Sequence, residues 1–146
     1  MALMLASPTE PTPAFMRTHQ LTRMHGGLHA IVCGTEPKPD DWRVVCDAIN
    51  LMETLVLDGM LDDADGTLPK AIEAMTDAAT RSVEGKGIRL DALGIQAVRG
   101  VLLDYQFVLE SLSHRVMLTC HRDTEKRVRA IQAGKTQAHD IVVVSL

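Results

Sequence analysis

Residues 91–119 read DALGIQAVRGVLLDYQFVLESLSHRVMLT, and this stretch decides the fold class. Its large apolar residues recur at alternating spacings of three and four positions, which is the heptad pattern of a helix that packs along one face. These residues are Ile95, Val98, Leu102, Tyr105, Leu109, Leu112 and Val116, followed by Thr119. Asp91 is the predicted N-cap, and no proline follows it. The pattern predicts a helix that extends to Gly134 over about 40 residues, or about 60 Å.

A helix of that length is too long for a compact bundle of 146 residues. We expect it either to bend near residues 111–113 or to project its C-terminal end from the body. Its apolar face is either the buried face of one domain or a two-fold helix pair between subunits. We favour the second interpretation, a homodimer. The predicted oligomer seam consists of Val98, Leu102, Tyr105, Leu109, Leu112 and Val116.

Three shorter helices are predicted before the long one, because apolar residues recur at helical spacing. Helix by helix, these residues are Leu21, Met24, Leu28 and Ile31; Trp42, Val45, Ile49, Met52 and Val56; and Ile72, Met75, Ala79 and Val83. Alanines 71, 74 and 78 offer a smooth flank for close helix packing. Thr12, Asp40 and Thr67 are the predicted start signals. Gly26 and Gly27 predict a kink or a break in the first helix, because glycine is a poor helix former.

The composition agrees with one helical domain. The chain is 46% hydrophobic and only 3% aromatic, so aliphatic side chains must build the core. We predict an all-α fold of about four helices, with a long C-terminal helix and a short extended (β) C-terminal tail. Residues 1–13 form an extended N-terminal segment, residues 14–134 the helical domain, and residues 135–146 the tail. The β-branched run at residues 141–144 favours a strand, which needs a partner such as the N-terminal stretch, a second subunit or another protein.

The sequence predicts a cytoplasmic protein that does not contact a membrane. No stretch approaches the ~20 consecutive apolar residues that span a bilayer. The apolar residues 1–6 lack the basic region of a signal peptide. The three cysteines show no paired spacing, which is typical of reduced thiols.

A basic stripe is the most prominent charge feature. The chain carries a net charge of −4, yet residues 114–135 hold six Lys and Arg against two Asp and Glu. The stripe consists of Arg115, His121, Arg122, Lys126 and Arg129, with the three arginines spaced by seven. Such a face can contact phosphates or an acidic protein surface. It can also be a solvated face that complements the dipole of the helix C-terminus.

Signals for metal binding or catalysis are weak. His25, His29 and Cys33 recur every four residues, and imidazole with thiolate suits zinc. The neighbouring Gly26 and Gly27 argue against the helix that would align them, so we interpret all three as structural or surface residues. Phosphate-binding loops and nucleophile motifs are missing from the sequence. We therefore predict no cofactor and no enzymatic activity.

Part of the chain resembles a known group of proteins. Residues 41–50, including Asp41, Trp42 and Asn50, and residues 88–99, followed by a polar helix rich in Arg and Glu, resemble short uncharacterised helical proteins encoded by phages and prophages of proteobacteria. The resemblance covers residues 40–134. It implies an accessory protein that acts in the bacterial cytoplasm on host or phage machinery, and it transfers no functional residue.

Three functional hypotheses follow, of which a metal-dependent enzyme or sensor built on His25, His29 and Cys33 is the least favoured. The first is a non-enzymatic interaction protein, a regulator or an inhibitor, that binds an unidentified protein through the basic stripe or the tail. The alternative is a small nucleic-acid-binding regulator that uses the same stripe.

Overall fold

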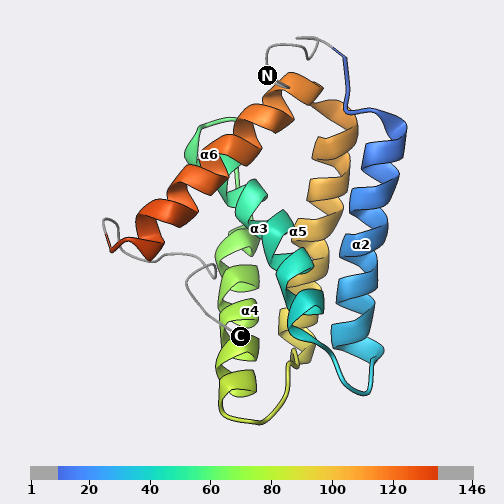
Figure 1. Cartoon of the computed structure of the whole chain (residues 1–146), viewed down its shortest axis with the longest axis vertical. Coiled ribbons are helices and arrows are strands. Elements are labelled where there is room, and N and C mark those ends of the chain that lie inside the picture. The colour runs from blue at the N-terminus through green and yellow to red at the C-terminus, as the bar shows by residue number, and fades with distance from the viewer. Residues whose placement is uncertain (1–9, 135–146) are drawn as a thin grey trace.

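The computed structural model describes residues 10–134, and this part of the chain is all-α (Figure 1). Its helices are α2 (Ala14–Cys33), α3 (Pro39–Leu57), α4 (Thr67–Val83), α5 (Ala92–Ser111) and α6 (His114–Gln132). The described range contains five helices and no strand, so the helical fold class is confirmed and the predicted count of about four is one short. The predicted C-terminal tail and most of the predicted N-terminal segment lie outside the described residues.

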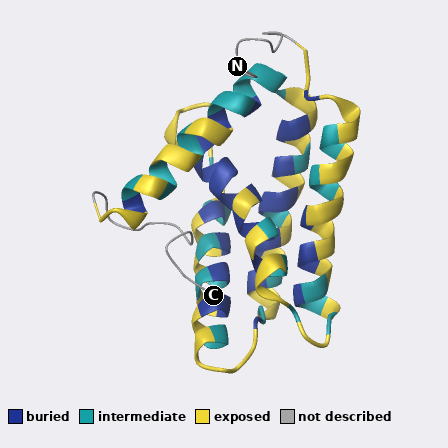
Figure 2. Ribbon diagram, viewed as in Figure 1, coloured by how far each residue is buried: buried dark blue, intermediate teal, exposed yellow. Residues whose placement is uncertain are grey.

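Helix α3 is the centre of the fold. It contacts each of the other four helices, and its residues from Val45 to Leu55 are buried with the exception of Asp47. Figure 2 shows this burial on α3, whereas the outer sides of α2 and α6 are largely exposed. The indole nitrogen of Trp42 donates a hydrogen bond to the Met75 carbonyl oxygen at 2.9 Å, which fixes α3 against α4.

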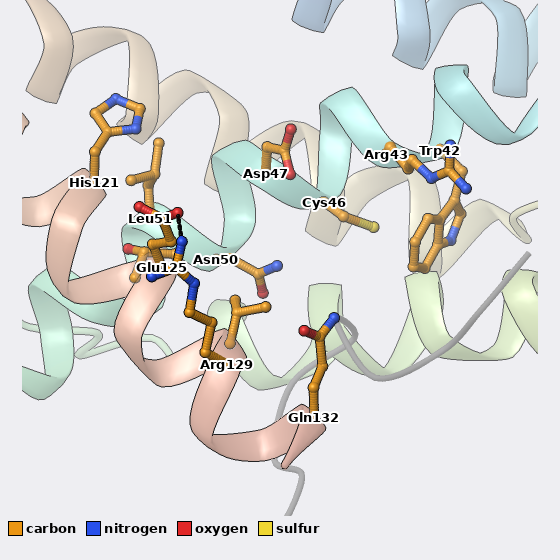
Figure 3. Close-up of a pocket in the computed structure, with 12 residues that line it drawn as sticks. Trp42, Arg43, Cys46, Asp47, Asn50, Leu51, His121, Glu125, Arg129 and Gln132 are labelled. Atoms are coloured by element: carbon orange, nitrogen blue, oxygen red, sulfur yellow. Dashed lines mark hydrogen bonds and ion pairs between the residues drawn. The ribbon is translucent and has the colours of Figure 1, made fainter.

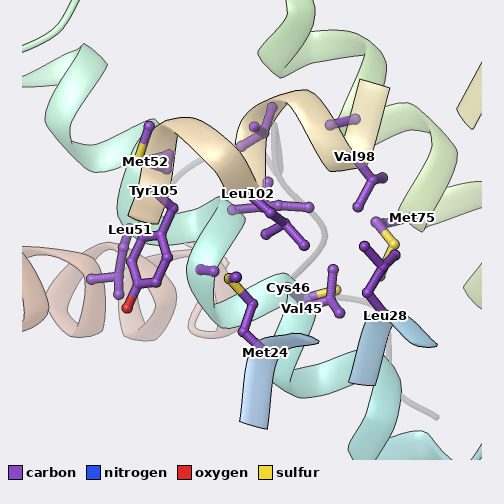
Figure 4. Close-up of a cluster of buried hydrophobic side chains, with 14 of the residues drawn as sticks. Met24, Leu28, Val45, Cys46, Leu51, Met52, Met75, Val98, Leu102 and Tyr105 are labelled. Atoms are coloured by element: carbon purple, nitrogen blue, oxygen red, sulfur yellow. The ribbon is translucent and has the colours of Figure 1, made fainter. Parts of the chain in front are cut away.

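Mostly aliphatic and sulfur-containing side chains from all five helices build the core, and α6 contributes Met117 and Cys120 to it (Figure 4). The predicted apolar faces are largely confirmed, because their central residues are buried: Met24, Leu28, Ile31, Trp42, Val45, Ile49, Met52, Met75 and Ala79. Val83 is an exception, since it is exposed at the end of α4. The alanine flank of α4 is confirmed as a close-packing surface. A methyl group placed on Gly94 of α5 would lie only 3.1 Å from the Ala74 Cβ.

The prediction of one continuous C-terminal helix is wrong. Of the two alternatives considered for it, the bend near residues 111–113 is confirmed. Helix α5 ends at Ser111, and α6 begins at His114 in a new direction (Figure 1). Ser113 caps α6, because its hydroxyl oxygen accepts a hydrogen bond from the Val116 amide at 3.2 Å. The Glu10 carbonyl accepts the His114 amide at 2.7 Å. The N-terminal segment thus supplies a partner for an amide that the break leaves without one.

Three predicted N-caps move by one or two residues. Pro13, rather than Thr12, caps α2. Lys38, rather than Asp40, caps α3, and its amide donates to the Asp41 carboxylate at 2.8 Å. Thr67 is the first residue of α4, and Gly66 rather than Thr67 occupies its N-cap position, whereas the Asp91 cap of α5 is confirmed by a 2.6 Å hydrogen bond from the Gly94 amide.

The predicted break at Gly26 and Gly27 is wrong, because α2 continues through both residues. Gly27 is buried against α3. A Cβ at this position would overlap Val44 Cγ2 and would lie 2.7 Å from the Asp41 carbonyl oxygen. Gly26 faces open space, with nothing within 4 Å of a Cβ. The weak helix propensity of Gly27 is therefore offset by the close approach of two helices that only glycine permits.

Substituting each glycine with alanine is expected to change stability in opposite directions. Gly27→Ala should lower the free energy of unfolding by about 1–3 kcal/mol, because backbone atoms of α3 must move. Gly26→Ala should raise it by about 0.5–1 kcal/mol through helix propensity alone. Urea denaturation of both variants beside the parent chain measures the difference. Equal effects of the two substitutions would contradict the α2–α3 contact.

Helix α5 is more apolar than the sequence reading expected. Its length of 20 residues and mean hydropathy of 1.2 are sufficient for a bilayer-spanning helix, so the expectation that no stretch approaches this limit is wrong. In the structure, 44% of this apolar stretch is buried inside the chain, and core helices of soluble proteins can be equally long and apolar.

A candidate binding cleft between α3 and α6

The basic stripe lies along the outer side of α6, but its charge is partly neutralised. His121, Arg122, Lys126 and Arg129 are exposed, whereas Arg115 is half-buried. Arg129 forms an ion pair with Glu125 one turn earlier. Arg122 and Lys126 therefore remain as the exposed members of the stripe that form no ion pair within the described residues.

One arginine of α6 faces inward instead. The Arg127 guanidinium lies 3.5 Å from the carboxylate of Glu53 on α3 and donates a 3.0 Å hydrogen bond to the Asn50 carbonyl oxygen. The hydroxyl groups of Thr54 and Thr124 are 2.6 Å apart, which adds a second polar contact. Helix α6 thus packs on α3 largely through polar groups, and it buries few apolar residues of its own.

Beside these contacts a cleft of about 620 Å³ opens between α3 and α6 (Figure 3). It has apolar surfaces and charged groups at its edges. From α3 the lining residues are Trp42, Arg43, Cys46, Asp47, Asn50 and Leu51, and from α6 they are His121, Thr124, Glu125, Val128, Arg129 and Gln132. The volume lies within the range of ligand-binding clefts. Two residues of the predicted stripe, His121 and Arg129, therefore belong to a site that also contains α3.

Asn50 is the most unusual residue of the cleft. The residue is only 2% exposed, and its Oδ1 atom has no hydrogen-bond partner within the described part of the chain. Figure 3 shows the amide of Asn50 extending from α3 toward the α6 side of the cleft, where Arg129 and Gln132 lie. A buried polar atom without a partner costs about 1–3 kcal/mol. A ligand that donates a hydrogen bond to Asn50 would remove this cost.

A smaller pocket of about 180 Å³ adjoins the cleft and shares Asp47, Leu51 and His121 with it. It continues toward α2, where Gln20 and Arg23 line it. The Gln20 Oε1 atom is also buried and has no hydrogen-bond partner among residues 10–134. We call the cleft and this adjoining pocket together the groove. The side-chain amides of Asn50 and Gln20 therefore lie along it, each with an oxygen atom that has no partner among the described residues.

Burial shifts the pKa values of three ionisable side chains in the groove. Burial raises the pKa of Asp47, and the charges of Arg23 and Arg43 oppose this shift. The pKa of His121 is lowered, first because protein atoms displace water from the imidazole and second because of the charge of His114, although part of the residue stays exposed. Burial raises the pKa of Tyr105 to about 12. Each shift has burial as its first cause, because burial penalises the charged form of a group.

The thiol of Cys46 is not poised for nucleophilic chemistry. Burial, and then the charge of Asp47, raise its pKa well above the ordinary value. A reactive cysteine requires the opposite shift, because the thiolate is the nucleophile. By this criterion Cys46 is not a candidate nucleophile of the groove.

The candidate metal ligands do not converge. His25, His29 and Cys33 are exposed along α2. His25 and Cys33 are separated by about 12 Å along the helix axis, which is too far for one ion. The His25 imidazole lies 3.3 Å from the Gln106 amide oxygen. Within residues 10–134, no three His, Cys, Asp or Glu side chains are placed to hold a metal ion.

The predicted oligomer seam faces the inside of the chain. Val98, Leu102, Tyr105 and Leu109 are buried among the other helices, and Leu112 and Val116 are half-buried near the break. The structure thus assigns these residues to the core of one domain, which is the first of the two interpretations of the pattern.

No family of known proteins, curated protein or solved structure matches the chain. Sequence reasoning had identified His121 and Arg129 but not Asn50, Gln20 or Trp42 as site residues. Asn50 carried one detectable signal, because it is a polar residue on a helix whose neighbouring positions are apolar.

Proposed function

We propose that this chain is a non-enzymatic interaction protein that binds an extended, largely apolar segment of another protein in the α3–α6 cleft. The observation that carries the proposal is the buried Oδ1 atom of Asn50, which has no hydrogen-bond partner among the residues that the structure describes. An extended segment presents backbone N–H groups along its length, and these are the donors that Asn50 lacks. Trp42, Leu51 and Val128 offer apolar contacts for its side chains.

A protein partner is favoured over nucleic acid by the charges. Arg129 is paired with Glu125, and Asp123 and Glu125 lie on the same helix as the remaining cations. Phosphate binding depends on several unpaired cations acting together. We further propose, on the resemblance inferred from the sequence alone for residues 40–134, a regulator or inhibitor whose partner belongs to host or phage machinery in the bacterial cytoplasm.

The test uses random 12-residue peptides displayed for selection against the full chain. Trp42 is the single tryptophan of the sequence and lines the cleft, so its fluorescence reports binding there directly. Selected peptides should shift the Trp42 emission on titration. Asn50→Leu should weaken their binding at least tenfold, which corresponds to about 1.4 kcal/mol, whereas the control Glu73→Gln on the exposed side of α4 should not.

The stability of Asn50→Leu separates function from structure. If Asn50 serves a ligand, replacing it removes an unpartnered polar group, so the free variant should be at least as stable as the parent chain. A destabilised variant that retains peptide binding would contradict the proposal. So would duplex DNA or RNA binding that persists at near-physiological salt, is lost in the double variant Arg122→Ala/Lys126→Ala, and occurs without any peptide binding.

A further inference from the structure

Helix α5 is apolar on two opposite faces. Its inner face is buried in the core, as described above. On the outer face, Leu93, Leu103 and Phe107 are 77%, 64% and 70% exposed. Exposed apolar side chains gathered on one face of a protein mark an interaction site more often than scattered ones do. Within residues 10–134, these three side chains remain largely uncovered.

The outer face follows a heptad pattern of its own. Leu93, Gln96, Gly100, Leu103 and Phe107 are spaced by three and four positions alternately. We name these five residues the outer α5 stripe. Gly100 lies at its middle, where a Cβ would lie 3.4 Å from the Thr67 Cγ2 atom, so α4 borders the stripe at this point. With its heptad spacing, the stripe has the form of a helix-pairing surface rather than of scattered apolar residues.

We propose that the outer α5 stripe binds the same stripe of a second copy of this chain, with the two α5 helices parallel. The argument is charge complementarity. Arg99 directly precedes Gly100, and Asp104 directly follows Leu103, so the two residues occupy opposite flanks of the stripe. In a parallel helix pair, a residue on the first flank lies beside the residue five positions later on the second flank of its partner. Arg99 then faces Asp104 of the partner subunit.

The two-fold axis repeats this ion pair on the other side of the interface. Arg99 and Asp104 are both exposed, and neither forms an ion pair with another residue in the described range. An antiparallel arrangement would place each flank beside itself and would bring no such opposite charges together. The charges thus select both the occupant, a second copy, and its orientation.

This interface is separate from the proposed peptide-binding cleft, because the cleft lies between α3 and α6. The two proposals therefore fail independently. The homodimer expected from the sequence is retained, but its contact surface moves from the inner face of α5 to the outer face.

The test is the mass of the full chain in solution, measured by sedimentation equilibrium over a range of concentrations. The parent chain should approach twice its 16.0 kDa monomer mass. Arg99→Glu and Asp104→Arg should each weaken dimerisation about tenfold, because each places like charges side by side. The double variant Arg99→Glu/Asp104→Arg should restore it. Leu103→Asp should give a folded monomer, and Val83→Asp, an equally exposed position on α4, should leave the dimer unchanged.

Three results would overturn the proposal. The first is a parent chain that stays monomeric up to about 100 µM, where mass action should favour the dimer. The second is either persistence of the dimer in Leu103→Asp or failure of the double variant Arg99→Glu/Asp104→Arg to restore dimerisation. The third is a monomer that co-sediments with phosphatidylcholine vesicles and loses this binding in Leu103→Asp, since the outer α5 stripe would then contact lipid.

Discussion

Leu102→Ala is expected to lower the free energy of unfolding by about 2–5 kcal/mol. Leu102 is 1% exposed and lies at the centre of the core, where α5 meets side chains of α2 and α3 (Figure 4). Removing its isobutyl group costs the transfer free energy of the lost atoms and leaves a cavity that the surrounding helices fill only partly. Urea denaturation monitored by circular dichroism measures the loss.

The neighbouring Leu103→Ala is the matched control. Leu103 has the same side chain on the same helix, but it points to the outer face. Its truncation should change the stability of the monomer by no more than about 0.5 kcal/mol. The comparison is made at a concentration low enough to keep the chain monomeric, because Leu103 belongs to the proposed dimer interface. A similar loss in both variants would mean that α5 is rotated relative to the structure.

These two leucines also show where sequence reasoning reaches its limit. Two apolar stripes run along α5, one through Leu102 and one through Leu103, and both have heptad spacing. Periodicity identifies a helix and its apolar faces. It does not state which of two apolar faces the rest of the chain covers. The sequence therefore predicted the helix correctly, and the homodimer stays a prediction. Which apolar face is buried in the core could be decided only from the packing of α2, α3 and α4.

The wrong predictions of where helices break or continue have one physical cause, which is contact with segments distant in the sequence. The pattern from Ile95 to Val116 runs through residues 111–113 without interruption, yet the chain breaks there, where the Glu10 carbonyl pairs with the His114 amide. Gly27 has the opposite outcome, since its low helix propensity is overridden by contact with α3. Local propensities are weak compared with such tertiary contacts.

The candidate site was predictable only in its exposed half. The charge pattern placed His121 and Arg129 in one stripe of a helix, and both line the cleft. It did not reveal that α6 folds back on α3, because the decisive contact joins Arg127 to Asn50, which are 77 positions apart in the sequence. The unpartnered amide of Asn50 becomes visible only when its surroundings are known.

Arg127→Met is expected to lower the free energy of unfolding by about 3–5 kcal/mol. The Arg127 and Glu53 side chains are only 18% and 10% exposed, and their charged groups are 3.5 Å apart. Removing the guanidinium leaves the Glu53 carboxylate between α3 and α6 without this cation, at a position from which most water is excluded. It also removes the hydrogen bond to the Asn50 carbonyl oxygen. Urea denaturation again gives the magnitude.

Two further variants decide whether the ion pair or the packing of residue 127 is responsible. Lys126→Met also introduces methionine, but in place of the adjacent, exposed cation. It should change the free energy of unfolding by no more than about 0.5 kcal/mol. The double variant Arg127→Met/Glu53→Leu removes both charges and should regain most of the loss, because a buried ion pair replaced by apolar groups is often neutral in stability. A double variant as unstable as Arg127→Met would show that α6 is held by the shape of the arginine rather than by its charge. Recovery would show that α6 is held to the body by a charge pair, a contact that one substitution on either helix can break.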